Sequence, residues 1–146
     1  MPRFAANLSF LFNEVPFPDR FTAAAEQGFT ACEFMFPYDY EAASLRQRLD
    51  VNGLRLVLFN AAQGNWEAGE RGIAAVPGRE AEFDAAILQA AAYARVLGNK
   101  MVHVMAGLET QGASRSMFLA NLRRGADLVA GDGLTLIIEP INTRDM

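Results

Sequence analysis

The feature that most constrains the fold is a regular alternation of short apolar runs with longer segments of helical periodicity. The apolar runs predict strands over 4–9, 31–36, 54–60, 100–106 and 134–139, and the amphipathic segments predict helices over 19–27, 40–52, 79–97 and 114–130. Parallel strands need crossover connections of about this length, whereas antiparallel strands can be joined by tight turns. The order therefore predicts right-handed crossovers and a parallel α/β sheet.

Two parallel folds fit this order, a doubly wound sheet and a (β/α)₈ barrel. Residues 7–12, which follow the first predicted strand, contain no glycine, and the chain has no GxxxxGK[ST] motif, so a Rossmann or P-loop phosphate turn is excluded. We therefore expect a parallel barrel of the TIM type. A complete barrel has eight strands and typically ~250 residues. With 146 residues, the chain is predicted to be a single domain, residues 1–146, that forms the N-terminal portion of an incomplete barrel, and a short open sheet is the alternative.

Composition excludes several classes of function. The formal net charge is −4 and the few clustered cations are diluted by neighbouring acids, which argues against a nucleic-acid binder. No stretch approaches the ~18 apolar residues that cross a bilayer, and the N-terminus lacks a signal-peptide pattern. Cys32 is the only cysteine, and its apolar surroundings predict a buried, unreactive thiol. We expect a cytoplasmic protein without nucleic-acid or membrane partners.

A carboxylate follows the fifth predicted strand. Function collects at the C-terminal ends of strands in parallel α/β folds, and Glu139 stands directly after the apolar run 136–138. A carboxylate in a barrel mouth is costly unless it meets a metal ion or a cation, and oxygen ligands at strand ends suit Mg²⁺ or Mn²⁺. We predict that Glu139 is catalytic and binds a divalent metal; a pair with a loop arginine is the alternative.

Other polar residues also fall at or near the strand ends: Asn7, Ser9, Glu33, Asn60, His103 and Asn142. His103, the only histidine, is either an imidazole that contacts substrate or a structural one. Glu33 is expected to form a structural pair with an arginine, and an orientation into the barrel mouth is the alternative. Asn7, Asn60 and His103 are included among the predicted substrate-binding residues.

Residues 61–78 form a long connection rich in glycine and proline. Long loops in compact domains are usually functional or disordered. An arginine can bind a carboxylate through two parallel hydrogen bonds, and a tryptophan can exclude water. Trp66 and Arg71 therefore suit an anionic substrate, and Glu70 is grouped with them as substrate-binding. A loop packed on a neighbouring subunit, with Trp66 at the interface, is the alternative.

Several runs of this sequence are shared with a known family: FAANLS at 4–9, EFMFPYDY at 33–40, Asn60, GNW at 64–66, GERG at 69–72, PGR at 77–79 and IEPIN at 138–142. The chain thereby resembles the hydroxypyruvate isomerase family, a branch of the xylose-isomerase-like TIM barrels. The similarity runs in order through essentially the whole chain. The runs at 33–40 and 66–72 are specific, whereas Glu139-Pro140 is shared more widely among sugar isomerases and epimerases.

The resemblance implies a (β/α)₈ barrel with one divalent metal, Mg²⁺ or Mn²⁺, in its mouth. It implies interconversion of hydroxypyruvate and tartronate semialdehyde by metal-assisted proton transfer through an enediolate. It also implies two glutamates that act as acid and base and bind the metal. Glu139 matches the first, and the second has no counterpart in the 146 residues. One carboxylate does not make a metal site, so the chain alone is expected to be inactive.

Two alternatives stay open. One is isomerisation of a 2-oxo-tetronate or a related sugar isomerase or epimerase activity, because pocket contacts separate substrates that differ by one hydroxylated carbon. The other is a non-catalytic half-barrel that self-associates, because an open parallel sheet has two edges. In the enzymatic cases the partner is a small hydroxy-oxo acid, and we expect a homo-oligomer.

Overall fold

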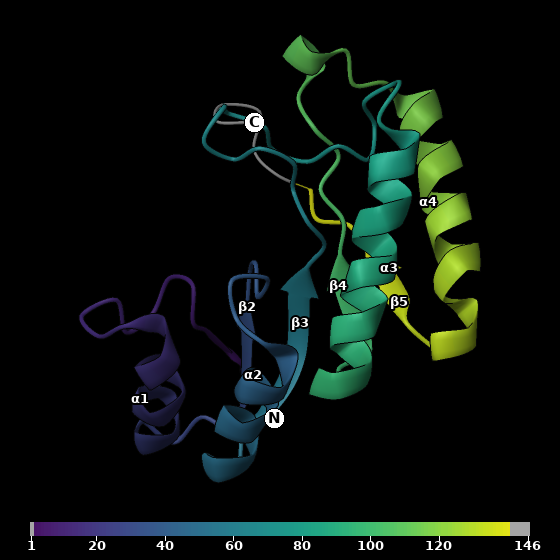
Figure 1. The fold of residues 1–146 in the computed structure, drawn as a ribbon. Helices are drawn as coiled ribbons and strands as arrows, with labels where there is room; N and C mark the ends of the chain where they lie inside the picture. The colour runs from purple at the N-terminus through teal and green to yellow at the C-terminus, as the bar shows by residue number, and fades with distance from the viewer. Residues whose placement is uncertain (1, 141–146) are drawn as a thin grey trace. The chain divides into compact units, whose positions relative to one another are not determined.

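The computed structural model of the chain describes residues 2–140, in which five strands alternate with four α-helices (Figure 1). The chain divides into two compact units. The first comprises the chain up to Phe59 together with Tyr93–Lys100, and the second comprises Asn60–Ala92 and the chain from Met101 onward. In the described part of the chain, no helix combines the length and the apolar character that a membrane span requires. The single domain predicted over residues 1–146 stays a prediction.

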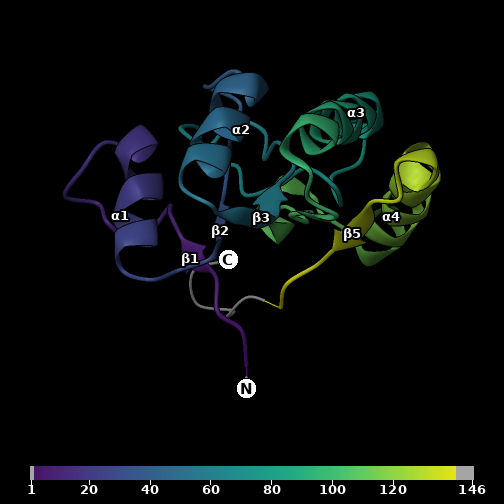
Figure 2. The same cartoon turned by 90° about the horizontal axis from the view of Figure 1, so that it is seen from below.

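The first unit consists of short parallel strands and the helices that connect them. Its elements are β1 (Ala6–Asn7), the 3-10 helix η1 (Phe17–Asp19), α1 (Arg20–Glu26), β2 (Ala31–Phe34), α2 (Ala42–Val51) and β3 (Arg55–Asn60). β1 pairs with β2 and β2 with β3, both in parallel, and Cys32 lies between Ala6 and Leu56. In Figure 2, α1 and α2 lie on the same side of β1 and β2. Leu45 and Leu49, one turn apart on α2, are fully buried, as their spacing predicts.

Cys32 confirms the prediction of a buried thiol. Its side chain is fully buried in the first unit. Burial, and to a lesser degree the neighbouring Glu33, raises the pKa of the thiol to about 12. Because only the thiolate is a strong nucleophile, the group is unreactive near neutral pH.

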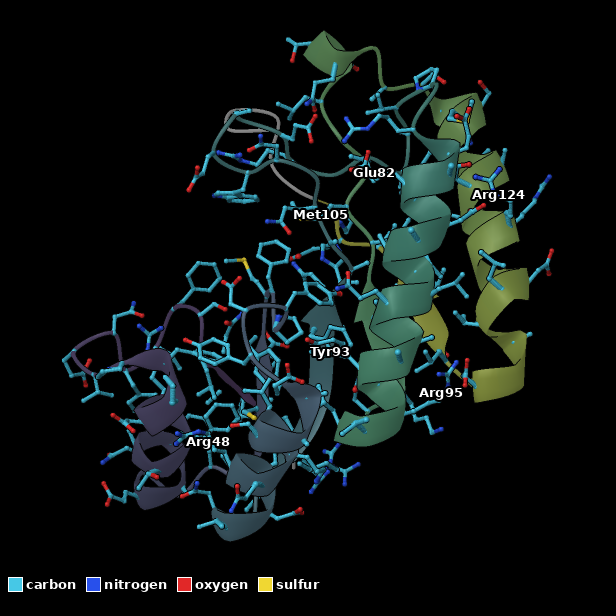
Figure 3. The ribbon with its side chains drawn as sticks, in the orientation of Figure 1. Arg48, Glu82, Tyr93, Arg95, Met105 and Arg124 are labelled. Atoms are coloured by element: carbon cyan, nitrogen blue, oxygen red, sulfur yellow. The ribbon has the colours of Figure 1, made fainter. Side chains whose placement is uncertain are left out.

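The second unit contains a long loop, two neighbouring helices and a pair of strands. Its elements are most of α3 (Glu80–Leu97), β4 (Met101–His103), η2 (Glu109–Gln111), α4 (Arg115–Val129), η3 (Ala130–Asp132) and β5 (Thr135–Ile137). β4 pairs with β5 in parallel, with His103 beside Ile137. The two helices lie side by side (Figure 1). Arg124 on α4, labelled in Figure 3, joins them, because its Nε donates to Asp84 Oδ1 at 2.7 Å and its Nη2 to the Glu80 carbonyl at 3.2 Å.

The strand order is that of a barrel. The strands follow one another as β1-β2-β3-β4-β5, which is their order in the sequence. A doubly wound sheet would instead reverse its strand order at a switch point. The parallel α/β fold of the TIM type that the alternation predicts is therefore confirmed.

All nine predicted elements are present in the predicted order, and several strands are shorter than predicted. The fourth was expected over 100–106 but ends at His103. Beyond it the backbone turns to pair with the long loop, since the carbonyls of Met105 and Ala106 accept from Ala74 N at 3.3 Å and Ala75 N at 2.7 Å. The first, expected over 4–9, is limited to Ala6–Asn7 because Asn7 Oδ1 accepts from Ser9 N at 3.0 Å and starts a turn.

Candidate active site

A pocket of about 380 Å³ lies in the second unit, at the C-terminal ends of β4 and β5. It is lined by Arg71, His103, Val104, Met105, Ala106, Gly107, Phe118, Ile138, Glu139 and Pro140. Its size suits a small organic molecule. The carboxyl ends of parallel strands are where this class of fold places its chemistry, so we take this pocket as the candidate active site.

The register of β4 and β5 brings His103 and Glu139 to the same pocket. His103 pairs with Ile137, and Val104 N donates to the Ile137 carbonyl at 2.9 Å. The C-terminal ends of β4 and β5 therefore lie next to each other. Glu139 follows two residues later and is exposed. The carboxylate is therefore directed to the pocket by the end of a paired strand rather than by a loop alone.

His103 is a neutral imidazole near pH 7. Its side chain is only 5% exposed. Burial lowers the pKa of the imidazole below its usual 6.5, and the negative charge of Glu139 acts in the opposite direction without cancelling the shift. A neutral imidazole carries one donor and one acceptor nitrogen, so His103 can both give and take a proton within the pocket.

Arg71 reaches the pocket from the long loop. Its guanidinium carbon lies 3.8 Å from the centroid of the Trp66 ring. Its Nη1 donates to the carbonyl oxygens of Trp66 at 3.2 Å and of Glu70 at 2.8 Å. The indole is 38% exposed, and it covers the cation rather than lining the pocket itself. The two residues predicted to bind an anionic substrate therefore contact each other, and of the two only Arg71 lines the pocket. Their binding of substrate stays a prediction.

The remaining predicted substrate-binding residues do not line this pocket. Glu70 forms an ion pair with Arg79 at 2.7 Å. Asn60 is buried, and its amide nitrogen lies 4.0 Å from the sulfur of Met105, which does line the pocket. Asn7 belongs to the first unit. Asn60 therefore contacts the pocket lining without being part of it, whereas the Glu70 carboxylate is engaged by Arg79.

Glu33 differs from its expected pairing. Its carboxylate accepts a hydrogen bond from Asn7 Nδ2 at 2.9 Å, and within residues 2–140 this amide takes the place of the expected arginine partner. The reason is local, because β1 and β2 pair in parallel with Asn7 beside Glu33. Asn142, the other polar residue predicted at a strand end, lies outside the described residues.

Seven of the ten residues that line the pocket were not predicted as site residues: Val104, Met105, Ala106, Gly107, Phe118, Ile138 and Pro140. Phe118 lies on α4, where an apolar residue is indistinguishable by pattern from a core residue. Met105 had a usable signal, since it falls two residues after His103 and shares its strand face by period 2.

The described residues do not form a complete metal site. In the range 2–140, no three His, Cys, Asp or Glu side chains come together closely enough to hold an ion. Glu139 and His103 supply two donors of the right chemical type to one pocket. A stable site needs more oxygen or nitrogen ligands than these two, so the predicted Mg²⁺ or Mn²⁺ stays a prediction.

Comparison with known proteins gives the class of the protein. Residues 21–146 match the family described as xylose isomerase-like TIM barrel. The chain therefore belongs to the xylose isomerase-like TIM barrel family.

Relatives narrow the position within this family. Over 150 residues the chain is 58% identical to a 2-oxo-tetronate isomerase of Cupriavidus necator, and over the same length it is 46% identical to the hydroxypyruvate isomerase of Escherichia coli. A solved structure, an AP endonuclease of family 2 from Brucella melitensis, matches with a TM-score of 0.95 at 49% identity. All three matches cover the whole chain, and the chain spans 58% of the length of each of these proteins. The resemblance to hydroxypyruvate isomerases noted from the sequence is thus confirmed.

Proposed function

We propose that this chain provides part of the active site of an isomerase that moves a proton between adjacent carbons of a small hydroxy-oxo acid. The observation that carries the proposal is the single pocket that brings together Glu139, His103 and Arg71. A carboxylate base, a neutral imidazole and a cation are the groups that such a proton transfer requires. The names of the relatives, a 2-oxo-tetronate isomerase and a hydroxypyruvate isomerase, support the same reaction class.

For hydroxypyruvate, the proposed roles follow from the chemistry of the side chains. The Glu139 carboxylate removes a proton from the hydroxymethyl carbon, and the freed electron pair forms the double bond of an enediolate. Glu139 returns the proton to the neighbouring carbon, which gives tartronate semialdehyde. Neutral His103 moves the remaining proton between the two oxygens, since it can donate at one nitrogen and accept at the other. The reaction is redox-neutral overall and needs no co-reactant.

A divalent cation would stabilise the negative oxygen of the enediolate. We propose Glu139 as one of its ligands, because oxygen donors suit Mg²⁺ and Mn²⁺. The further ligands, and a second glutamate, would have to come from outside residues 2–140. For this reason we expect the 146-residue chain to turn substrate over poorly by itself.

Isomerisation of a 2-oxo-tetronate is the second candidate. It is supported by the 58% identity to the Cupriavidus necator relative, against 46% to the hydroxypyruvate isomerase of Escherichia coli. The two substrates share the 2-oxo acid group and differ in the rest of the carbon chain. A panel of hydroxypyruvate and the two 2-oxo-tetronate enantiomers, compared by kcat/KM, decides between them.

The test uses the chain alone and a chimaera in which residues 1–140 are joined to the corresponding remainder of the Cupriavidus necator relative. Both are assayed with Mg²⁺ and with Mn²⁺ for isomerisation and for exchange of substrate carbon-bound hydrogen with D₂O. We expect turnover by the chimaera, and we expect Glu139→Gln in the chimaera to lower kcat by about 10²–10⁴-fold, the usual contribution of a general base. Glu109→Gln, an exposed substitution outside the pocket, is the matched control.

Two results would contradict the proposal. Full activity of the Glu139→Gln chimaera would remove Glu139 from the reaction. Robust turnover by the chain alone would show that residues 1–146 hold a complete site, and the proposed need for further ligands would be wrong.

A further inference from the structure

The guanidinium of Arg71 is held by two kinds of contact, one at the face of the group and one at its Nη1 nitrogen. The Trp66 ring covers its face, and Nη1 is committed to two backbone carbonyls. Within residues 2–140, Nε and Nη2 donate to no protein group and Arg71 forms no ion pair. The edge that these two nitrogens share therefore stays open at a residue that lines the pocket. That edge matches the two oxygens of a carboxylate.

The neighbouring residues of the loop hold this arrangement in place. Glu70 accepts from Arg79 Nη1 at 2.7 Å and from the backbone nitrogen of Asn65 at 2.5 Å, and both contacts, Arg79 first, lower the pKa of the Glu70 carboxyl. Arg79 also pairs with Glu82 in the first turn of α3, labelled in Figure 3. The charge of Arg79 is thus neutralised by two carboxylates, whereas Arg71 pairs with no carboxylate within residues 2–140.

The base of the loop is fastened by backbone hydrogen bonds. Gly72 N donates to the Gln63 carbonyl at 3.0 Å, and Gly72 pairs with Ala106 in an isolated antiparallel bridge. A side chain at Gly72 would collide with the backbone of Met105, and one at Gly107 would lie 2.8 Å from the Gly72 carbonyl oxygen. The two glycines allow the loop to lie directly against the continuation of β4. Arg71, the residue before Gly72, is therefore held at the pocket by its neighbours on both sides.

We propose that Arg71 selects substrates that carry a carboxylate, and that Glu70 and Arg79 are positioning residues that keep its Nε–Nη2 edge turned to the pocket. The inference rests on the proposed function, because it names the substrate group that the same pocket recognises. The negative charge of Glu139 on the same pocket repels the carboxylate. A 2-oxo acid is thereby oriented with its carboxylate at Arg71 and its reacting carbons toward Glu139. A neutral sugar of similar size gains neither effect.

The chain contains its own probe for this contact, because Trp66 is its only tryptophan and stacks on Arg71. We would follow tryptophan emission of the 146-residue chain during titration with D-glycerate and, separately, with glycerol. Both ligands have three carbons, and neither contains the ketone or aldehyde group needed for isomerisation. D-glycerate carries a carboxylate and glycerol does not. We expect a saturable response to D-glycerate and at least ~10-fold weaker binding of glycerol, the effect of losing charge-assisted hydrogen bonds.

Four variants separate selection from positioning. Arg71→Lys keeps the positive charge but loses the edge formed by Nε and Nη2, and we expect it to weaken D-glycerate binding by ~10-fold. Arg71→Gln also removes the charge and should abolish D-glycerate binding. Glu70→Gln should weaken binding several-fold, and the double variant Glu70→Gln/Arg71→Lys should bind no more weakly than Arg71→Lys alone. Such non-additivity is expected when one residue acts through the other, whereas independent effects would add. Arg123→Gln, an exposed charge removal on α4, is the control, and urea unfolding checks the fold of each variant.

The inference is overturned if the wild-type chain gives no saturable response, if it binds glycerol as well as D-glycerate, or if Arg71→Lys and Arg71→Gln bind like the wild type. Additive losses in the double variant would overturn the positioning role of Glu70. A different result would contradict the proposed function alone: D-glycerate binding would depend on Arg71, but neither the chain nor the chimaera would isomerise a 2-oxo acid. Conversely, isomerisation that is lost in Glu139→Gln but unaffected by Arg71→Gln leaves the proposed function standing without this inference.

Discussion

Gly72 shows how a single residue fixes the position of the pocket's cation. Its φ of +110° is unfavourable for any residue with a side chain, and an added Cβ would strike the backbone of Met105 rather than a flexible side chain. Gly69 in the same loop has a φ of +88° but nothing within 4 Å of an added Cβ. Substitutions at Gly69 and Gly72 therefore distinguish the energetic cost of a positive φ from the cost of a steric collision.

We predict that Gly69→Ala lowers the free energy of unfolding by about 1 kcal/mol, the cost of the backbone conformation alone. Gly72→Ala should cost about 2–4 kcal/mol, because the loop must also move away from β4. Urea unfolding of both variants measures the difference. Equal losses would show that the loop does not lie against the strand as described.

At the scale of single residues, the sequence identifies part of the site. Glu139 and His103 were predicted because each is an ionisable residue at the C-terminal end of an apolar run, and Arg71 because it shares a long loop with a tryptophan. The partner of Glu70 could not be found, since Arg79 and Arg71 are equally plausible partners in one dimension. Phe118 could not be found either, because lining a pocket and filling a core require the same kind of side chain.

At the scale of elements, periodicity predicts type and order but not ends. The segment 104–106 has the composition of a strand and yet leaves the sheet to bond with the loop at 72–75. That partner is about thirty residues away in the sequence, and local pattern carries no information about it. The helices are predicted more closely because capping and buried spacing are local, as at Ser114, whose side chain accepts from Met117 N at the start of α4.

The edge strands of the described sheet carry a prediction about association. β1 and β5 are its two ends, and Ile138, directly after β5, is 55% exposed. Unpaired strand edges with apolar side chains favour pairing with another chain. We expect light scattering to give a mass above 15.9 kDa that rises with concentration, and Ile138→Lys to reduce it.

The control for association is Leu88→Lys, which adds the same charge at a residue that is 48% exposed on a helix, α3. It should leave the mass unchanged. A stable monomer at all concentrations would contradict the self-association that we expect of this chain.

At the scale of the whole molecule, the fold explains how residues 71, 103 and 139 come to line one pocket. Parallel strands in sequence order place successive strand ends at one edge of the sheet, so polar residues that are far apart in the chain become neighbours. The xylose isomerase-like family assignment rests on the matched sequence and the fold. The chemistry proposed here rests on one further claim, that the Glu139 carboxylate faces this pocket beside His103.

A pH titration of His103 by NMR tests that claim most directly, because the chain has a single histidine. Burial lowers the pKa of the imidazole below 6.5, and the charge of Glu139 partly offsets this effect. We predict a midpoint below 6.5 in the wild-type chain, a still lower midpoint in Glu139→Gln, and no change in the control Glu109→Gln. A midpoint that Glu139→Gln leaves unchanged would show that the carboxylate does not face the pocket, and the proposed active site would be wrong.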